Sequence, residues 1–335
     1  MLGLLVRLLI SAMLVGILFY TIDLSAVLEN LLKVDREVFV FGCIAVFGLT
    51  FLSALRWKIV LSEMEKEVPY KEVWKITAIG TFFNQALPSS IGGDAFRILL
   101  IRKVGLGLSK ATISVFIDRF AGLFAILMLS VFTVPVMVNV GGNIDFAVSV
   151  AFVILALFVG TIVLLHLETF VRPFVKLLHL SRAALHTNLV KITDLIFDLS
   201  PYLRRILFGN TKSVAIFILS IMIQLGLISV AVALCFSLGV PIGVWQSFAV
   251  VAPALLLGAL PISLAGWGVR EGAMVFTLGV LGVDHGSALA ISLLFGLSIT
   301  LGGLPGGLVW LMFKSSVTPV NVEFDDLPAV KDRIT

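Results

Sequence analysis

Charge is scarce in this sequence of 335 residues, of which only 13% are Asp, Glu, Lys or Arg while 59% are hydrophobic. Soluble globular domains are about one quarter charged, so water is excluded as the solvent of most of the chain. Lys and Arg exceed Asp and Glu by 24 − 20 = 4. In a membrane protein this surplus concerns loops and lipid headgroups, and we expect no nucleic-acid partner. The composition predicts an all-α, polytopic membrane protein.

Cysteine is also scarce, and the motifs of metal and nucleotide chemistry are missing. Cys43 and Cys235 lie in apolar runs, which argues against a disulfide framework and against a zinc site. The sequence contains no Walker-type GxxxxGK[ST] and no HExxH, and its four histidines lie near the ends of predicted spans or in loops. We therefore expect no metal, no cofactor and no catalytic residue, and we do not expect an enzyme.

What the sequence does contain is long apolar stretches. Six of them are long enough to cross a bilayer: 3–22, 37–60, 109–138, 147–167, 213–239 and 287–313. The first begins like a signal peptide, but no cleavage-site pattern follows it, so we expect a span there. Two further apolar segments, 73–91 and 245–264, end in stretches that contain proline and glycine.

The loops between these segments differ in charge. Lys and Arg gather in 56–75, 97–110 and 168–212 and are absent from 139–146 and 240–244. Since basic loops stay in the cytoplasm, 56–75 and 97–110 share one side of the membrane. The region between them, 73–104, must then enter and leave on that side, which predicts a re-entrant hairpin. With six full spans, both termini are expected in the cytoplasm.

A repeat appears where the two shorter segments break. The stretch "ALPSSIGGDAFR", residues 86–97, and the stretch "ALPISLAGWGVR", residues 259–270, share six of twelve letters at an offset of 173 residues. The shared letters include Pro, Gly and Arg, which chance matches between apolar runs do not produce. Three predicted spans lie between the two stretches, so the second should enter from the opposite face. This predicts an inverted-topology repeat with two re-entrant hairpins, a pattern that marks transport sites near the midplane.

We expect a single transmembrane domain, residues 1–314, whose repeat halves are about 1–138 and 145–314. Within it, the basic stretch 168–212 carries apolar residues at helical spacing, which predicts an amphipathic cytoplasmic segment. Such a segment packs on the protein's own surface or lies on the bilayer. Residues 315–335 are expected to form a polar cytoplasmic tail.

The repeated letters have a physical meaning. Pro88 and Pro261 remove a helical N–H group and clash with the preceding turn, so each entering helix should stop there. Glycines permit backbone turns that are closed to other residues, and four follow these prolines: Gly92, Gly93, Gly266 and Gly268. A second helix should then start near Asp94 and near Val269, with the positive end of its dipole facing a cavity.

Arg97 and Arg270 fall in the first turns of these second helices. A helix N-terminus beside an arginine favours an anionic group such as phosphate. Two such sites, one facing each leaflet, are predicted docking points for a lipid headgroup. Two alternatives stay open: Arg97 as an ordinary cytoplasmic charge, and Arg270 as a charge that Glu271 neutralises.

Other polar residues lie close to these breaks or deep in a span. Asp118 and Arg119 lie about a dozen ångströms along their predicted helix, where ionisable groups usually serve function or form a salt bridge. Asn84 and Gln85 precede the first proline and could cap the broken backbone or contact substrate. The candidate substrate-binding residues are Arg97, Arg270, Asn84, Gln85, Ser90, Gly93, Asp94, Ser263, Gly266, Glu271, Asp118 and Arg119.

The stretches "FFNQALPSSIGGDAFRI" and "LPISLAGWGVREG" resemble the two signatures of the lysylphosphatidylglycerol synthase transmembrane, or flippase-like, family. That family includes the lipid-flipping half of the multiple peptide resistance factors. The resemblance implies translocation of a charged-headgroup lipid: a phospholipid, an aminoacylated lipid or a polyprenyl-phosphate-linked glycan. Two-part members carry an aminoacyl-transfer domain after the membrane part. This chain ends shortly after Lys314, so we expect lipid synthesis to reside in a separate enzyme.

The sequence is compatible with three classes of function. A lipid flippase or scramblase would work downhill, or coupled to ions through Asp94, Asp118 or Glu271. A small-solute or ion-coupled secondary transporter fits the same repeat, although the wide apolar surroundings favour a lipid. An intramembrane lipid-modifying enzyme would need a nucleophile–base pair or metal ligands. The expected partners are membrane lipids, a lipid-synthesising enzyme and, in a homo-oligomer, further copies, in a prokaryotic cytoplasmic membrane.

Overall fold

The computed structural model describes residues 24–64, 66–87, 92–135, 144–167, 199–206, 211–259 and 267–314, with a few single positions besides. The regular elements of this described part are α-helices, without a strand. In chain order they are α2 (Leu24–Lys33), α3 (Arg36–Glu63), α4 (Tyr70–Ala86), α5 (Gly92–Lys103), α6 (Leu108–Val131), α8 (Ile144–Leu165), α11 (Thr211–Ser237), α12 (Val244–Ala259), α13 (Val269–Val280), α14 (His285–Gly303) and α15 (Pro305–Lys314). The prediction of an all-α, polytopic membrane protein is confirmed.

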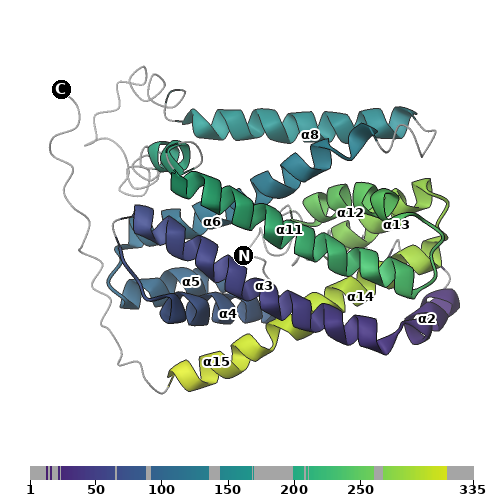
Figure 1. The fold of residues 1–335 in the computed structure, drawn as a ribbon, viewed down its shortest axis with the longest axis horizontal. Helices are drawn as coiled ribbons and strands as arrows, with labels where there is room; N and C mark the ends of the chain where they lie inside the picture. Colours follow the sequence, from purple (N-terminus) through teal and green to yellow (C-terminus); the bar gives the residue numbers. More distant parts are fainter. Residues whose placement is uncertain are drawn as a thin grey trace.

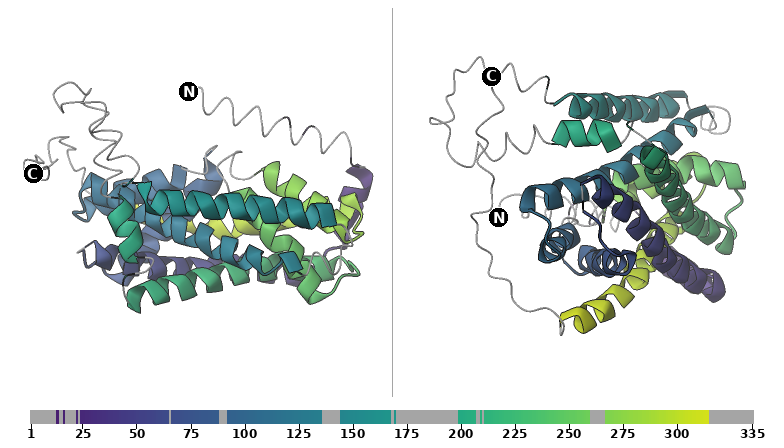
Figure 2. Two further views of the ribbon diagram at one scale, coloured as in Figure 1. Left: turned by 90° about the horizontal axis from the view of Figure 1, so that it is seen from above. Right: turned by 60° about the vertical axis from the view of Figure 1, so that its left-hand side comes forward.

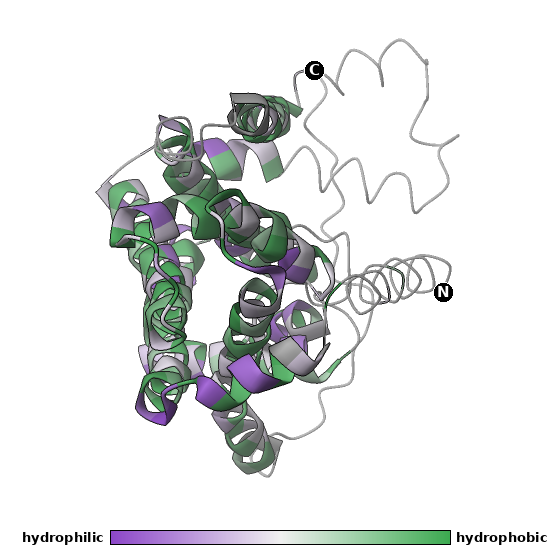
Figure 3. Cartoon of the chain, turned by 90° about the vertical axis from the view of Figure 1, so that its right-hand side faces the viewer, coloured by the Kyte–Doolittle hydropathy of each residue, from purple (hydrophilic) through white to green (hydrophobic). Residues whose placement is uncertain are grey.

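Within the described residues, five stretches of helix are long and apolar enough to cross a membrane. They are Arg36–Glu63, Leu108–Val131, Val148–Leu165, Thr211–Ser237 and His285–Met312. The start of each stretch lies within two residues of the start of a predicted span. The sixth predicted span, 3–22, lies outside the described residues apart from single positions. The long helices run in roughly the same direction through the molecule (Figure 2), and hydrophobic residues cover most of the ribbon when it is viewed end-on (Figure 3).

The last predicted span, 287–313, is not one regular helix. Helix α14 ends at Gly303 and α15 begins at Pro305, with Leu304 between them. Proline cannot donate the helical hydrogen bond and its ring clashes with the preceding turn, so the helix breaks there. The predicted span 287–313 contains this proline, and no break was predicted there.

Hydrogen bonds cap α3 and α14 and join the start of α3 to the end of α11. Asp35 caps α3 by accepting a hydrogen bond from the N–H of Glu37 at 2.8 Å, and its own N–H donates to Ser237 Oγ at 2.7 Å. Asp284 caps α14 by accepting from the N–H of Ser287 at 2.8 Å. Burial alone would raise the pKa of Asp284, but hydrogen bonds from the hydroxyl and N–H of Ser287 and from neighbouring N–H groups hold it below its usual value.

The helices pack as two similar halves. In each half a long helix is followed by a packed pair of short helices, α4 with α5 and α12 with α13. Across the halves α3 packs against α11, and the contact of α3 with α14 has a counterpart in the contact of α11 with α6. The buried apolar residues form two clusters, one centred on α3 to α6 and one centred on α11 to α14. The predicted repeat therefore has a counterpart in helix packing.

The two short helix pairs lie toward opposite ends of the long helices (Figure 1). Helices α4 and α12 contain 17 and 16 residues. At 1.5 Å per residue they are about 25 Å long, which is less than the ~30 Å thickness of a hydrocarbon core. Helices α5 and α13 contain 12 residues each and are shorter still. These lengths match the predicted hairpins, whose re-entry into a membrane stays a prediction.

Helix α4 ends where the sequence predicts. Its last residue is Ala86, and Leu87 takes an extended conformation with φ −96° and ψ 145°. The residue before a proline is pushed out of the helical region, so Pro88 accounts for this end. The hairpin tips, residues 88–91 and 260–266, lie outside the described residues. So do 171–198 within the predicted amphipathic segment and the predicted tail, 315–335.

Candidate functional site

Arg97 of α5 lies within the apolar bundle and forms an ion pair there. The residue is 5% exposed, and its Nη2 donates to Asp118 Oδ2 of α6 at 2.7 Å. The other oxygen of Asp118, Oδ1, accepts from Arg56 Nε of α3 at 2.8 Å. Asp118 thus bridges two guanidinium groups on two other helices. Arg56 also donates to Ser220 of α11 at 3.1 Å, which ties this half to the other.

The guanidinium of Arg97 has a closely fitting surround. Its central carbon lies 4.1 Å from the ring centroid of Trp57, a cation–π distance. Helix α4 leaves room for the Arg97 side chain at Gly80. If Gly80 carried a Cβ atom, that atom would lie 2.6 Å from Cγ of Arg97, which is too close. Among the described residues, the Nε–H of Arg97 is buried and has no hydrogen-bond acceptor. One donor of the arginine is therefore unused.

Asp94 and Arg119 form a second ion pair on the more open side of Arg97. Arg119 Nε donates to the two oxygens of Asp94 at 2.8 and 3.0 Å. Nη1 of Arg97 lies 3.6 Å from Asp94 Oδ1. Asp94 is in the first turn of α5, where the helix dipole favours a negative charge.

These side chains make up a five-residue charge cluster: Arg56, Arg97, Arg119, Asp94 and Asp118. Three guanidinium groups carry +3 and two carboxylates carry −2, so the cluster has a formal charge of +1. Ionisable groups at membrane depth are expensive and usually face a partner or a functional cavity. The arrangement can accommodate one further negative charge.

Arg270 of α13 has a simpler environment. Its Nε donates to Glu271 Oε1 at 3.0 Å, and its Nη2 contacts the same oxygen. Glu271 Oε2 accepts from the N–H of Gly268 at 2.6 Å and so caps the start of α13. The rings of Trp267 and Phe295 lie 5.1 and 5.8 Å from the guanidinium carbon. The pair is buried and its formal charge is zero, in line with the alternative that Glu271 neutralises Arg270.

The glycines near the breaks do not all serve turns. Gly268 has φ +87°, which only glycine adopts readily, as predicted. Gly92 and Gly93, predicted as turn residues, instead lie in the first turn of α5. A Cβ atom on Gly93 would collide with the backbone oxygen of Gly80 and with Asn84. Close packing of α4 on α5 is therefore the physical reason for this glycine.

The remaining predicted residues are in two groups. Asn84 Oδ1 accepts from the N–H of Gly93 at 3.0 Å, so it joins the two helices of the first pair, while Gln85 lies half-buried near Gly303. The others lie outside the described residues: Pro88, Ser90, Pro261, Ser263 and Gly266.

Arg56 was counted with the basic loop residues of 56–75, and this was wrong. It lies inside α3, is buried and shares Asp118 with Arg97. Its neighbour Trp57, which stacks on Arg97, was not predicted either. The available signal was an arginine that interrupts the apolar run "FLSALRW".

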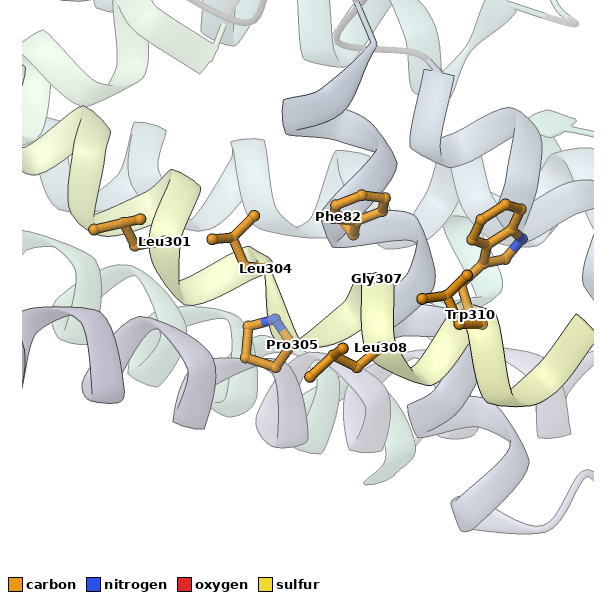
Figure 4. A pocket seen from close by; sticks show the side chains of 8 residues that line it. Phe82, Leu301, Leu304, Pro305, Gly307, Leu308 and Trp310 are labelled. Carbon is orange, nitrogen blue, oxygen red and sulfur yellow. The ribbon is translucent and has the colours of Figure 1, made fainter.

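An apolar pocket of about 540 Å³ lies at the break between α14 and α15, against α4 (Figure 4). It is lined by Phe82, Leu301, Leu304, Pro305, Gly307, Leu308, Trp310 and Leu311. This lining offers no charge to a headgroup and contains none of the predicted site residues. Within the described part of the chain, no cluster of His, Cys, Asp and Glu could hold a metal ion.

A family of known proteins matches most of the chain. The family described as the lysylphosphatidylglycerol synthase TM region matches residues 4–306 of the chain. A comparison with curated proteins gave no match. The matched region includes both short helix pairs, the five-residue charge cluster and the Arg270–Glu271 pair.

Proposed function

We propose that this chain, which belongs to the lysylphosphatidylglycerol synthase transmembrane-region family, moves a lipid with a charged, phosphate-containing headgroup between membrane leaflets. One observation carries the proposal: Arg97 and Arg270 are buried at the same repeat position of two short helix pairs inside an apolar bundle. Cations at such depth are costly and usually serve function. A translocated headgroup is an anion that would need them there.

The path that we propose runs between the two helix pairs, which act as re-entrant, inverted hairpins. Their short helices and their places toward opposite ends of the long helices support entry from opposite faces (Figure 1). Broken helices in corresponding halves of an inverted repeat form the binding sites of many transporters. Each hairpin would then present one arginine to a headgroup that arrives from its own leaflet.

Guanidinium groups suit a phosphate because their planar fork donates two parallel hydrogen bonds. Between transport events each arginine is paired with a carboxylate, Arg97 with Asp118 and Arg270 with Glu271. An unpaired charge at this depth would be strongly destabilising, so these carboxylates stabilise the empty protein. The headgroup phosphate would share the arginines with them during passage.

Nothing in this process breaks a covalent bond, so we propose a transporter and not an enzyme. Movement would be downhill, or coupled to an ion through a buried carboxylate. The proposed partners are membrane lipids, a separate enzyme that makes the carried lipid and, in a homo-oligomer, further copies of the chain. We place the protein in a prokaryotic cytoplasmic membrane with both termini in the cytoplasm.

Leaflet exchange in liposomes tests the proposal. The full chain would be reconstituted with fluorescent phosphatidylglycerol or polyprenyl phosphate, and quenching of the outer leaflet would follow exchange. Arg97→Gln and Arg270→Gln should each slow exchange about ten- to a hundredfold, since a charge-assisted bond contributes ~1.5–3 kcal/mol. Lysine should restore part of the rate, because it keeps the charge without the planar fork.

Arg36→Gln is the matched control, because it removes an exposed arginine at the start of α3. It should exchange lipid at the parent rate. If both buried arginine variants are folded and also keep the parent rate, the two arginines do not bind the headgroup. Uptake of a small solute without any lipid exchange would favour the secondary transporter instead.

A further inference from the structure

We propose that Asp94 is an internal anion that occupies the phosphate position of the first half, and that an incoming phosphate displaces it. The inference rests on the proposed function for its ligand, a phosphate-bearing headgroup. It adds that the carboxylate of Asp94 occupies the binding position of the first half and must move away before a phosphate can bind. Asp94 would therefore compete with the ligand.

The first step is the geometry of the Asp94 carboxylate. It accepts from Nε of Arg119 at 2.8 and 3.0 Å and lies 3.6 Å from Nη1 of Arg97. It also lies in the first turn of α5, a helix of 12 residues. An anion between two guanidinium groups at a helix N-terminus has the partners that proteins provide for bound phosphate.

The second step is the unused binding capacity of the cluster. The buried Nε–H of Arg97 has no acceptor among the described residues. The five-residue charge cluster also has a formal charge of +1. A phosphate that enters beside Asp94 adds a negative charge to this cluster and can accept from Arg119 and from the Nη1 of Arg97, the two donors that face Asp94. The phosphate can therefore compete with Asp94 for these donors.

The third step is access. The side chains of Arg56, Arg97 and Asp118 are at most 8% exposed. On the other side of the cluster, the side chain of Arg119 is 47% exposed and that of Asp94 is 14% exposed. Asp118 is thus enclosed and positions Arg97, whereas the Asp94–Arg119 pair can separate without opening the core. An anion would enter on that side.

The second half has no equivalent of this contact. The residue 173 positions after Asp94 is Trp267, and the residue 173 positions after Arg119 is Ser292. Arg270 is paired with its own neighbour, Glu271. The inference thus concerns the first half alone.

The test measures binding to the full chain in detergent, with two probes used separately: dihexanoyl-phosphatidylglycerol and inorganic phosphate. Quenching of tryptophan fluorescence is a suitable signal, because Trp57 stacks on Arg97. Asp94→Asn should bind the lipid probe on the order of tenfold more tightly, as the competing charge is gone. Arg119→Gln should bind it on the order of tenfold less tightly.

Two controls separate competition from general charge effects. Asp94→Glu keeps the negative charge and should not bind more tightly than the parent. Glu72→Gln removes an acid from the first turn of α4, where it pairs with Lys75 and not with the cluster. It should bind like the parent.

Tighter binding of both probes by Asp94→Asn supports the inference with the phosphate group as the recognised part. Tighter binding of the lipid probe alone also supports the inference, and it identifies a lipid headgroup, and not free phosphate, as the ligand that displaces Asp94. If folded Asp94→Asn binds no more tightly than the parent in a protein that does exchange lipid, this inference is overturned and the proposed function stands. If binding tightens but the parent exchanges no lipid, the proposed function fails and the internal anion stands.

Discussion

The two arginines at matching repeat positions, Arg97 and Arg270, differ in how they are held. Arg97 shares Asp118 with an arginine of another helix and lies near a second carboxylate, so its ion pairs connect α3, α5 and α6. Arg270 is held by the next residue in its own helix, Glu271, which also caps that helix. The first site has a formal charge of +1 and the second has none.

This difference teaches that a repeated motif need not produce two equal sites. The partners of Arg97 have no counterparts, since Ile291 and Trp267 stand 173 positions after Asp118 and Asp94. Conversely, the position that matches Glu271 in the first half is Ile98. The repeat thus supplies two buried cations, while their anions come from α5 and α6 in the first half and from α13 alone in the second. A net positive site and a neutral site can bind one headgroup with unequal strength.

The largest expected effect concerns the orientation of the two hairpins in the membrane. A cysteine label reacts either from one side of the membrane or from the other, so the result is all or none. Single cysteines at Glu67, before α4, and at Pro241, before α12, lie at exposed positions that precede the two hairpins. In a background without Cys43 and Cys235, they should react with a membrane-impermeant maleimide from opposite sides of the membrane. Labelling from one side would contradict the inversion, and the two halves would then not be comparable as opposite entrances.

The next effect concerns stability and separates the two sites. Asp118→Asn leaves two buried guanidinium groups without their charge partner, so we expect a loss of about 3–5 kcal/mol. Glu271→Gln leaves one buried guanidinium group without its charge partner and keeps an oxygen for the cap at Gly268. We therefore expect a smaller loss of stability, about 1.5–3 kcal/mol. Thermal unfolding of both variants in detergent would show whether Asp118→Asn loses more stability than Glu271→Gln.

The smallest effect concerns the second helix of each pair. In Gly93→Ala the new methyl group would meet the backbone of α4, and such overpacking costs about 1–3 kcal/mol. In Gly272→Ala of α13 the methyl group meets no atom of the described residues within 4 Å. That variant should gain about 0.5–1 kcal/mol from helix propensity. Equal unfolding temperatures for the two variants would show that α5 is not packed more tightly than α13.

Much of the fold could be predicted from local patterns. The starts of α3, α6, α8, α11 and α14 lie within three residues of the predicted spans, because an apolar run of that length has few other conformations in a membrane. The end of α4 followed from Pro88. The break at Pro305 was missed because prolines are also tolerated inside membrane helices when neighbours satisfy the freed backbone groups.

The candidate site was predictable only in its outline. Arg97, Asp94, Asp118 and Arg119 were all singled out, and the structure brings all four together. Arg56 was assigned to a loop because a positive charge near the end of a span is ordinary in a membrane protein. Its burial depends on contact with α6 and α11, helices that lie far from it in the sequence.

By itself, the sequence determined the membrane class, the starts of the five long helices and the end of α4 before Pro88, because these depend on local properties: apolar length and proline. It also determined that each half carries one arginine beside its break. Only the tertiary structure decided which charges meet. Ion pairs form between side chains a few ångströms apart, and the packing of α3, α5 and α6 sets those distances. For that reason equal motifs gave a five-residue charge cluster in one half and a neutral pair in the other.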